Sequence, residues 1–343
     1  MRNTFPRLFG NAEITKRLSS LIISSSLPHA MIIVGPEGSG KHTLALETVS
    51  ALNCENRLSE SFPLPCGACS RCKRIASGAF PDVSYLKREV GKSTIGVDEL
   101  RAFREDMFLS ATESECKCYI IEDADAMTPA AQNALLKVLE EPPKNVYIIL
   151  ICKEADKLLT TIKSRAQSFS TEIFIADELH RHVLSLSPEA RSMAAADPEK
   201  LRGILLSSNG IIGKALSHLG GDESDAEALR ASVMSIVSVM PKKVSFSALY
   251  SAVAALPQKR DELRRTLELL VTALRDMLTY KVSGEFTPSF FTSLEACEGA
   301  LTGLGARRIV SIFEVINSAL ADLDKNVLIA PLLTDIALKI REA

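Results

Sequence analysis

The chain has 343 residues, of which 46% are hydrophobic and 24% are charged, and its formal net charge is −2. This composition is typical of a globular protein with roughly two or three domains, each with a core of its own. The charge balance excludes a basic field over the whole chain, so any contact with DNA would be local or shared with partners. No apolar run reaches the roughly 20 residues of a membrane helix, and the N-terminus lacks a signal-peptide core. We therefore expect a cytoplasmic protein without a membrane partner.

A phosphate-binding loop is predicted near the N-terminus. After a predicted helix over residues 11–27, the run Ala30–Val34 is typical of a buried strand, and a helix is predicted over residues 41–52. The segment Gly35–Lys41 between them, GPEGSGK, matches the G-x-x-x-x-G-K part of a Walker A loop. Such a loop binds phosphates through its backbone N–H groups and its lysine. A chance glycine-rich turn is the alternative, and the flanking strand and helix argue against it.

The residue after the lysine departs from the Walker A pattern. Magnesium needs a Ser or Thr hydroxyl there, but the chain has His42. An imidazole is a poor ligand for a hard cation that prefers oxygen. Thr43 comes one residue late, about 100° further round the helix. The sequence therefore predicts phosphate binding by the loop and argues against ordered magnesium.

Four cysteines follow this helix closely. They are Cys54, Cys66, Cys69 and Cys72. Four thiolates complete a tetrahedral zinc site, and two successive C-x-x-C steps provide local knuckle geometry. We expect a structural zinc module over about residues 54–80, while an iron–sulfur cluster and redox disulfides remain alternatives. The other cysteines are interpreted as small buried apolar residues; they are Cys116, Cys118, Cys152 and Cys297.

Strands and helices then alternate. Further strands are predicted over residues 81–86, 119–121, 146–152 and 167–174. A helix over residues 97–109 should turn Leu100, Phe103 and Phe108 inward. The alternation predicts a parallel, doubly wound sheet with helices on both faces.

An acidic tip, Glu122–Asp125, follows the third predicted strand. Thr128 is the expected N-cap of the next helix, with Pro129 in its first turn. In an open parallel sheet the ligand binds at the carboxyl ends of the strands, where this tip and the glycine-rich loop both fall. The candidate nucleotide-binding residues are Gly35, Gly38, Gly40, Lys41, His42, Thr43, Glu122 and Asp123.

Strand signals stop after about residue 174, and the remainder has helical periodicity. The acidic, glycine-bearing segment 220–225 is the expected domain boundary. The long predicted helix over residues 259–280 carries a leucine stripe typical of a bundle core. We predict a P-loop domain at 1–174, a small helical lid at 175–222 and an all-α domain at 223–343.

These features together resemble the bacterial DNA polymerase III clamp-loader subunits of the AAA+ class, and among them the delta-prime type. The resemblance rests on the strand and GPxGxGK loop, on the four cysteines, and on several shorter runs. The shorter runs are Thr94–Arg101, NALLKVLEEPP at Asn133–Pro143, Ser164-Arg165-Ala166, Gly210–Leu216, and Asn326-Val327 followed by Leu328 and Leu332. The family has Ser-Arg-Cys where this chain has Ser-Arg-Ala.

Three positions distinguish the chain from the ATP-hydrolysing gamma/tau motor of this family. The first is His42. The second is the acidic pair, which is Asp-Glu in a motor and Glu122-Asp123 here, so that the general base is shortened or lost. The third is Gly213, where a motor has an arginine that contacts the phosphates; the adjacent Lys214 should point elsewhere on its helix.

The resemblance implies a subunit that does not hydrolyse ATP, with ATP and magnesium doubtful in its own degenerate site. Arg165, with Ser164, would act as an arginine finger in the site of a neighbouring motor subunit. Implied partners are the gamma/tau and delta subunits, with the sliding clamp and primer–template DNA reached within the assembly. Residues 223–343 would form an oligomerisation collar. The alternatives are an active gamma/tau-like ATPase motor and a zinc-stabilised interaction scaffold outside the replisome.

Overall fold

A computed structural model of the chain places its secondary structure in two compact units. The first unit comprises Met1–Phe174 with Ile211–Gly213, and the second comprises Ile175–Gly210 with Lys214–Ala343. The described residues are 4–89, 92, 94–220, 223–241, 244–286, 289–291, 293–324 and 327–343. Residues 221 and 222 of the predicted boundary and Asn326 of the resemblance lie outside them.

The first unit is built on a five-stranded parallel sheet. Its strands are β1 (Ala30–Val34), β2 (Val83–Leu86), β3 (Lys117–Ile121), β4 (Val146–Cys152) and β5 (Gln167–Ser170). Their order in the sheet is β2-β3-β4-β1-β5, and every pair is parallel. The carboxyl ends of all five strands therefore lie together at one end of the sheet, and their amino ends lie at the opposite end.

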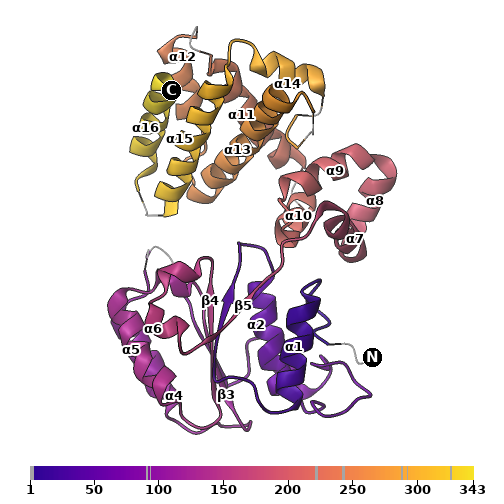
Figure 1. Ribbon diagram of the computed structural model, residues 1–343, viewed down its shortest axis with the longest axis vertical. Helices are drawn as coiled ribbons and strands as arrows, with labels where there is room; N and C mark the ends of the chain where they lie inside the picture. The colour runs from indigo at the N-terminus through magenta and orange to yellow at the C-terminus, as the bar shows by residue number, and fades with distance from the viewer. Residues whose placement is uncertain are drawn as a thin grey trace. The chain divides into compact units, whose positions relative to one another are not determined.

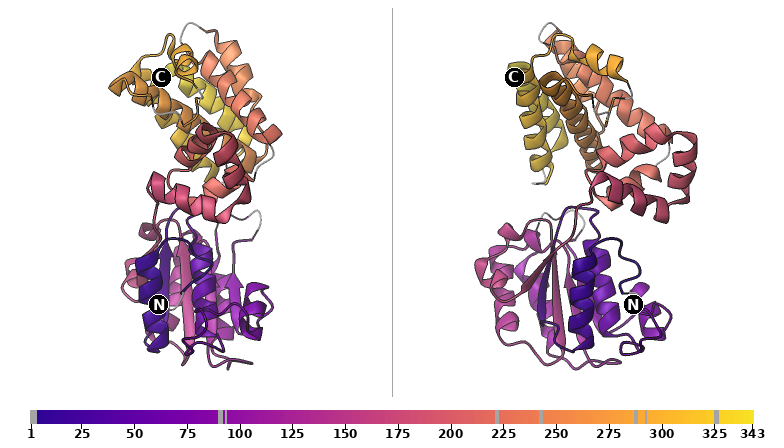
Figure 2. Two further views of the ribbon diagram at one scale, coloured as in Figure 1. Left: turned by 90° about the vertical axis from the view of Figure 1, so that its right-hand side faces the viewer. Right: turned by 45° about the vertical axis from the view of Figure 1, so that its right-hand side comes forward.

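Helices cover both faces of this sheet, as predicted (Figures 1 and 2). One face packs against α1 (Ala12–Ile23) and α2 (Lys41–Leu52), with α3 (Ser70–Ala76) beside α2. The other packs against α4 (Val97–Met107), α5 (Pro129–Glu140) and the short α6 (Thr160–Lys163). Successive β1 residues alternate between the two cores, with Met31 and Ile33 in one and Ala30 and Ile32 in the other. This is the burial expected of a strand covered on both faces.

Several details differ from the sequence-based expectation, among them the starts of β2 at Val83 and of β3 at Lys117. The last strand ends at Ser170 rather than Phe174, because Val34 at the end of β1 provides its final pairing partner. The first helix ends at Ile23, where Ser24 bonds the carbonyls of the last turn. Phe108 was expected to face inward, but 57% of its surface is exposed because α4 has already ended at Met107.

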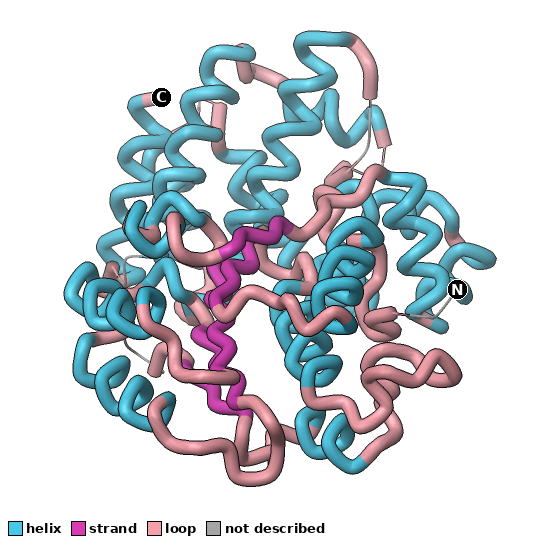
Figure 3. Tube along the Cα trace, turned by 60° about the horizontal axis from the view of Figure 1, so that its bottom comes forward, coloured by secondary structure: helices cyan, strands magenta, loops and turns pink. Residues whose placement is uncertain are grey.

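The regular elements of the second unit, within the part of the chain that the structure describes, are helices (Figure 3). A first group contains α7 (Ala176–Leu186), α8 (Pro188–Ala196), α9 (Pro198–Ser207) and α10 (Ile212–Leu219), whose first two residues belong to the first unit. The second group contains α11 (Glu223–Val239), α12 (Phe246–Ala254), α13 (Arg260–Ser283), α14 (Leu294–Leu301), α15 (Ala306–Asp324) and α16 (Ile329–Glu342). These six helices share one hydrophobic core, which includes Leu263, Leu267, Leu270 and Leu274 of the predicted stripe. Among the described residues, none of the helices has both the length and the apolar character needed to cross a membrane.

Candidate functional site

The glycine-rich loop has the conformation expected of a phosphate-binding loop. It leaves β1 at Gly35, whose N–H donates to the Cys152 carbonyl at the end of β4 (3.3 Å). Gly38 and Gly40 have φ angles of 81° and 89°, a region that favours glycine. Gly40 is the N-cap of α2, so the loop leads directly into a helix N-terminus. A chance glycine-rich turn would not require this strand–loop–helix geometry.

Lys41 is hydrogen-bonded within its own loop. Its Nζ donates to the carbonyl oxygens of Gly35 (2.6 Å) and Pro36 (2.7 Å). Burial, with a further contribution from the positive charge of Lys153, lowers the pKa of Lys41. A phosphate bound by this side chain would have to replace the two loop carbonyls as its partners.

Basic side chains surround the acidic tip. Glu122 Oε1 lies 3.1 Å from Nε2 of His42 and 2.9 Å from Nζ of Lys87. Burial would raise the pKa of Glu122, but its contacts with His42 and Lys87 outweigh burial and hold the pKa below its usual value. The next carboxylate, that of Asp123, lies 3.4 Å from Nη2 of Arg88. His42 is therefore itself a partner of the acidic tip.

Lys87 and Arg88 were not predicted as site residues. Both directly follow β2, and the N–H of Glu122 donates to the Leu86 carbonyl at the end of that strand (2.9 Å). The rule that ligands gather at the carboxyl ends of parallel strands could have identified them. The third residue of the tip, Asp125, has a structural role, because its carboxylate accepts the N–H groups of Lys153 and Glu154.

A cavity of about 440 Å³ connects the loop and the tip. Its lining residues are Glu37, Gly38, Gly40, Lys41, His42, Thr43, Arg88, Glu122, Asp123, Ile151, Cys152 and Lys153. Seven of the eight predicted nucleotide-binding residues line it, and Thr43 is among them. Gly35, the eighth, lies at the base of the loop, where Lys41 reaches its carbonyl.

Gly213, at the start of α10, contacts the glycine-rich loop. Its N–H donates to the Gly38 carbonyl (3.0 Å). A Cβ at position 213 would lie 2.6 Å from that oxygen and 2.8 Å from the Cα of Gly38. An arginine here is therefore incompatible with this contact. The neighbouring Lys214 forms an ion pair with Glu268 of α13 (3.6 Å).

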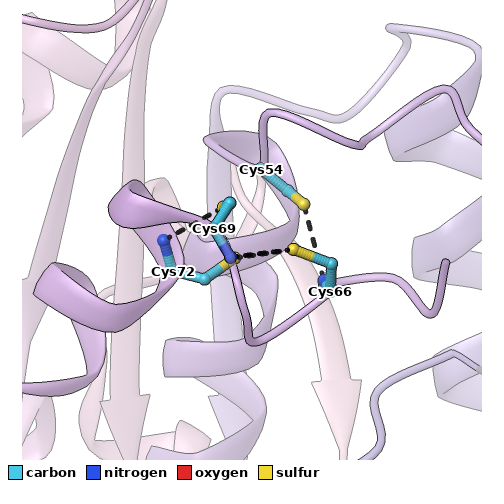
Figure 4. Close-up of side chains that lie close together, drawn as sticks. All are labelled: Cys54, Cys66, Cys69 and Cys72. Carbon is cyan, nitrogen blue, oxygen red and sulfur yellow. Dashed lines mark hydrogen bonds between the residues drawn. The ribbon is translucent and has the colours of Figure 1, made fainter.

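The four predicted cysteines converge on one point (Figure 4). Their sulfur atoms all lie within 4.8 Å of one another. Backbone N–H groups point at three of the sulfurs, from Cys66 to Cys54, from Cys69 to Cys66 and from Cys72 to Cys69, each at 3.4 Å. Such bonds stabilise sulfur in its thiolate form. Cys54 comes just after the C-cap of α2, so the cluster is attached to the helix that follows the phosphate loop.

The donor set fits a metal ion. Four sulfurs about 2.3 Å from a zinc ion would lie about 3.8 Å apart, and the sulfurs of Cys66 and Cys72 are 4.0 Å apart. Sharing of a proton with Cys72 lowers the pKa of Cys54 to about 5 and raises that of Cys72. The other cysteines are buried, as predicted; they are Cys116, Cys118, Cys152 and Cys297.

Arg165 lies near the amino ends of the strands, whereas the glycine-rich loop lies at their carboxyl ends. It follows α6 and precedes β5, whose first residue pairs with Met31 near the start of β1. From Met31 to Gly35 a strand advances about 13 Å at 3.3 Å per residue. The guanidinium is about one-third exposed, and its Nη1 donates to the Thr161 carbonyl (2.9 Å) and to Oγ of Ser164 (3.2 Å). The structure therefore separates Arg165 from the chain's own cavity.

Residues 10–173 match the family model described as "DNA polymerase III, delta subunit". This region is therefore similar to that family. The predicted resemblance to the delta-prime and gamma/tau subunits is thereby confirmed, and the curated relatives agree with it.

The relatives include both subunit types. The tau subunit of Bacillus subtilis is 30% identical over 81% of this chain and 50% of its own length. The delta-prime subunit of the same organism is 29% identical over 80% of this chain and 78% of its own length. The delta-prime subunit of Yersinia pestis is 36% identical over 40% of this chain and 39% of its own length. The chain thus spans half the length of the tau relative.

Replacing Gly213 by alanine should weaken its contact with the loop. The new Cβ would meet backbone atoms of Gly38, which cannot move aside as a side chain can, and we expect a cost of about 1–3 kcal/mol. Hydrogen–deuterium exchange should then be faster in residues 35–41. Gly299→Ala is the matched control, since a Cβ at this helical glycine would meet no neighbouring atom within 4 Å. Equal exchange in Gly213→Ala and the wild type would show that the contact does not restrain the loop.

Proposed function

We propose that the chain is a delta-prime-type subunit of the DNA polymerase III clamp loader that does not itself hydrolyse ATP. The observation that carries the proposal is the pairing of His42 and Lys87 with Glu122, where an active ATPase holds magnesium. The family match over residues 10–173 supports the assignment to the clamp loader.

The ion pairs at the tip oppose both magnesium binding and the removal of a proton from the attacking water. Magnesium bridges the β- and γ-phosphates in P-loop enzymes and prefers oxygen ligands, but position 42 offers a nitrogen that faces Glu122. A general base must accept a proton from the attacking water, and a carboxylate paired with two basic groups has a lowered affinity for protons. The same residues therefore weaken metal binding and base catalysis together.

Arg165 is the residue through which the chain would contribute to catalysis. A guanidinium stabilises the charge that develops on a transferring phosphoryl group. Arg165 lies at the end of the strands opposite to the chain's own cavity, and this position supports action in trans, on ATP held by a gamma/tau motor subunit. Ser164 would support it, since its Oγ accepts from the guanidinium and donates to the Thr161 carbonyl (3.0 Å).

The remaining parts have roles in assembly under this proposal. The helices over residues 223–343 would form the collar that holds the gamma/tau and delta subunits together, with residues 175–222 as a lid. Contact with the sliding clamp and primer–template DNA would be shared among subunits, in keeping with a net charge of −2. Cys54, Cys66, Cys69 and Cys72 would hold a structural zinc ion, whose closed coordination leaves no position for catalysis.

The isolated chain should show no magnesium-dependent ATP turnover. Lys41→Ala should leave the background rate unchanged, because the wild-type site already lacks ordered magnesium and a free base. A phosphate-release assay with and without magnesium measures this. Turnover that Lys41→Ala abolishes would instead identify the chain as a motor subunit.

In a reconstituted clamp loader with clamp and primed DNA, Arg165→Ala should reduce ATP turnover about tenfold or more, equivalent to about 1.4 kcal/mol. The loss follows from removing a positive charge from the neighbouring site. Lys163→Ala is the matched control: it removes a cation two residues away whose partner is Asp156 (3.4 Å). Size-exclusion chromatography must show intact assembly in both variants. Failure of the chain to join polymerase III subunits, with no effect of Arg165→Ala, would favour a scaffold outside the replisome.

Removal of zinc should unfold the module over about residues 54–80. We expect about one zinc ion per chain, and a chelator should make this segment sensitive to proteolysis because metal binding supplies its folding energy. Cys66→Ser should lose the metal, whereas Cys116→Ser, a buried cysteine outside the cluster, should retain it. Metal analysis by plasma mass spectrometry distinguishes zinc from iron and from an empty thiol cluster.

A further inference from the structure

Arg165 has an acidic partner on another helix. Its Nη2 lies 2.7 Å from Oε1 of Glu140, the last residue of α5. Glu140 contacts Nη2 of the guanidinium, and Thr161 and Ser164 accept from Nη1, so both terminal nitrogens have partners. A guanidinium has five N–H donors, so three partners leave two donors for an incoming phosphoryl oxygen.

This ion pair is poorly placed to stabilise the fold. Side-chain exposure is 34% for Arg165 and 49% for Glu140, and exposed pairs contribute little to stability because water screens them. The ion pair instead affects the direction in which the guanidinium of Arg165 points. A free arginine samples many rotamers, whereas contacts at both terminal nitrogens restrict this one to a narrow set.

Glu140 is fixed to the same rigid body as the arginine. The buried Gln132 of α5 donates from Nε2 to the Lys157 carbonyl (3.2 Å), and its Oε1 accepts the Leu159 N–H (2.7 Å). Leu159 is the N-cap of α6, which leads to Arg165. The carboxylate therefore has a defined position relative to the arginine backbone, as an orienting group requires.

We propose that Glu140 is a positioning residue for Arg165, holding the guanidinium in the direction from which it meets the phosphoryl group of a neighbouring subunit. The inference rests on the proposed function, because it gives Arg165 its role as a finger. In this role Glu140 would act through Arg165 rather than on the nucleotide itself. Its removal should therefore slow the chemical step and leave nucleotide binding by the neighbour intact.

The test uses the reconstituted clamp loader with clamp and primed DNA. Glu140→Gln keeps the size of the side chain and removes its charge, and it should lower kcat for ATP about 3- to 10-fold with KM unchanged. Glu140→Asp should recover part of the rate. Glu141→Gln is the matched control, because Glu141 is the adjacent glutamate and has no ion pair with Arg165 among the described contacts. Thermal unfolding should be the same for all of these chains.

The double variant with Arg165→Ala separates the two hypotheses. If Glu140 acts through the arginine, Glu140→Gln should cause no further loss in the Arg165→Ala background. An equal loss in both backgrounds, or a faster rate in the single variant, would overturn the positioning role. If Arg165→Ala lowers the rate and Glu140→Gln does not, the inference fails and the proposed function stands. If Arg165→Ala has no effect, the proposed function fails and the inference fails with it.

Discussion

The parallel direction of all five strands is the constraint on which the rest of the structure depends. Because all strands run in the same direction, every loop that follows a strand lies at one end of the sheet, and every segment that precedes a strand lies at the opposite end. The phosphate loop, the acidic tip and the basic pair Lys87-Arg88 all leave strands. Arg165 enters one. This arrangement places the cavity beside the glycine-rich loop and Arg165 at opposite ends of the strands.

Much of this arrangement could be predicted from the sequence. The strands, the loop and the N-cap at Thr128 have local signals, and Thr128 does accept the N–H of Ala131. The four cysteines were identified from spacing alone. Phe108 was misplaced because helical periodicity does not show where a helix stops. The pairing of His42 with Glu122 has no local signal, since it brings together residues from α2 and from the tip after β3.

The same limit applies to Arg165. The role proposed for Arg165 rests on the family resemblance, whereas its contact with Glu140 depends on how the end of α5 meets the end of α6. The run NALLKVLEEPP was recognised as specific, yet the sequence does not show which of its two glutamates faces an arginine. Side-chain pairs between elements are set by packing, and packing is the part of a fold that periodicity describes least.

Three groups in or beside the cavity, His42, Gly213 and Lys41, share one feature, which is that each contacts another part of the protein. His42 stands where the Walker A pattern has a hydroxyl, and its ring lies against the carboxylate of Glu122. Gly213 donates its N–H to the loop carbonyl of Gly38, and a longer side chain would prevent that approach. Lys41 turns to the carbonyls of its own loop. Each of these groups therefore already has a partner within the protein. If the chain is a non-hydrolysing subunit, as proposed, a single substitution at this site should not restore hydrolysis, because the other contacts would remain.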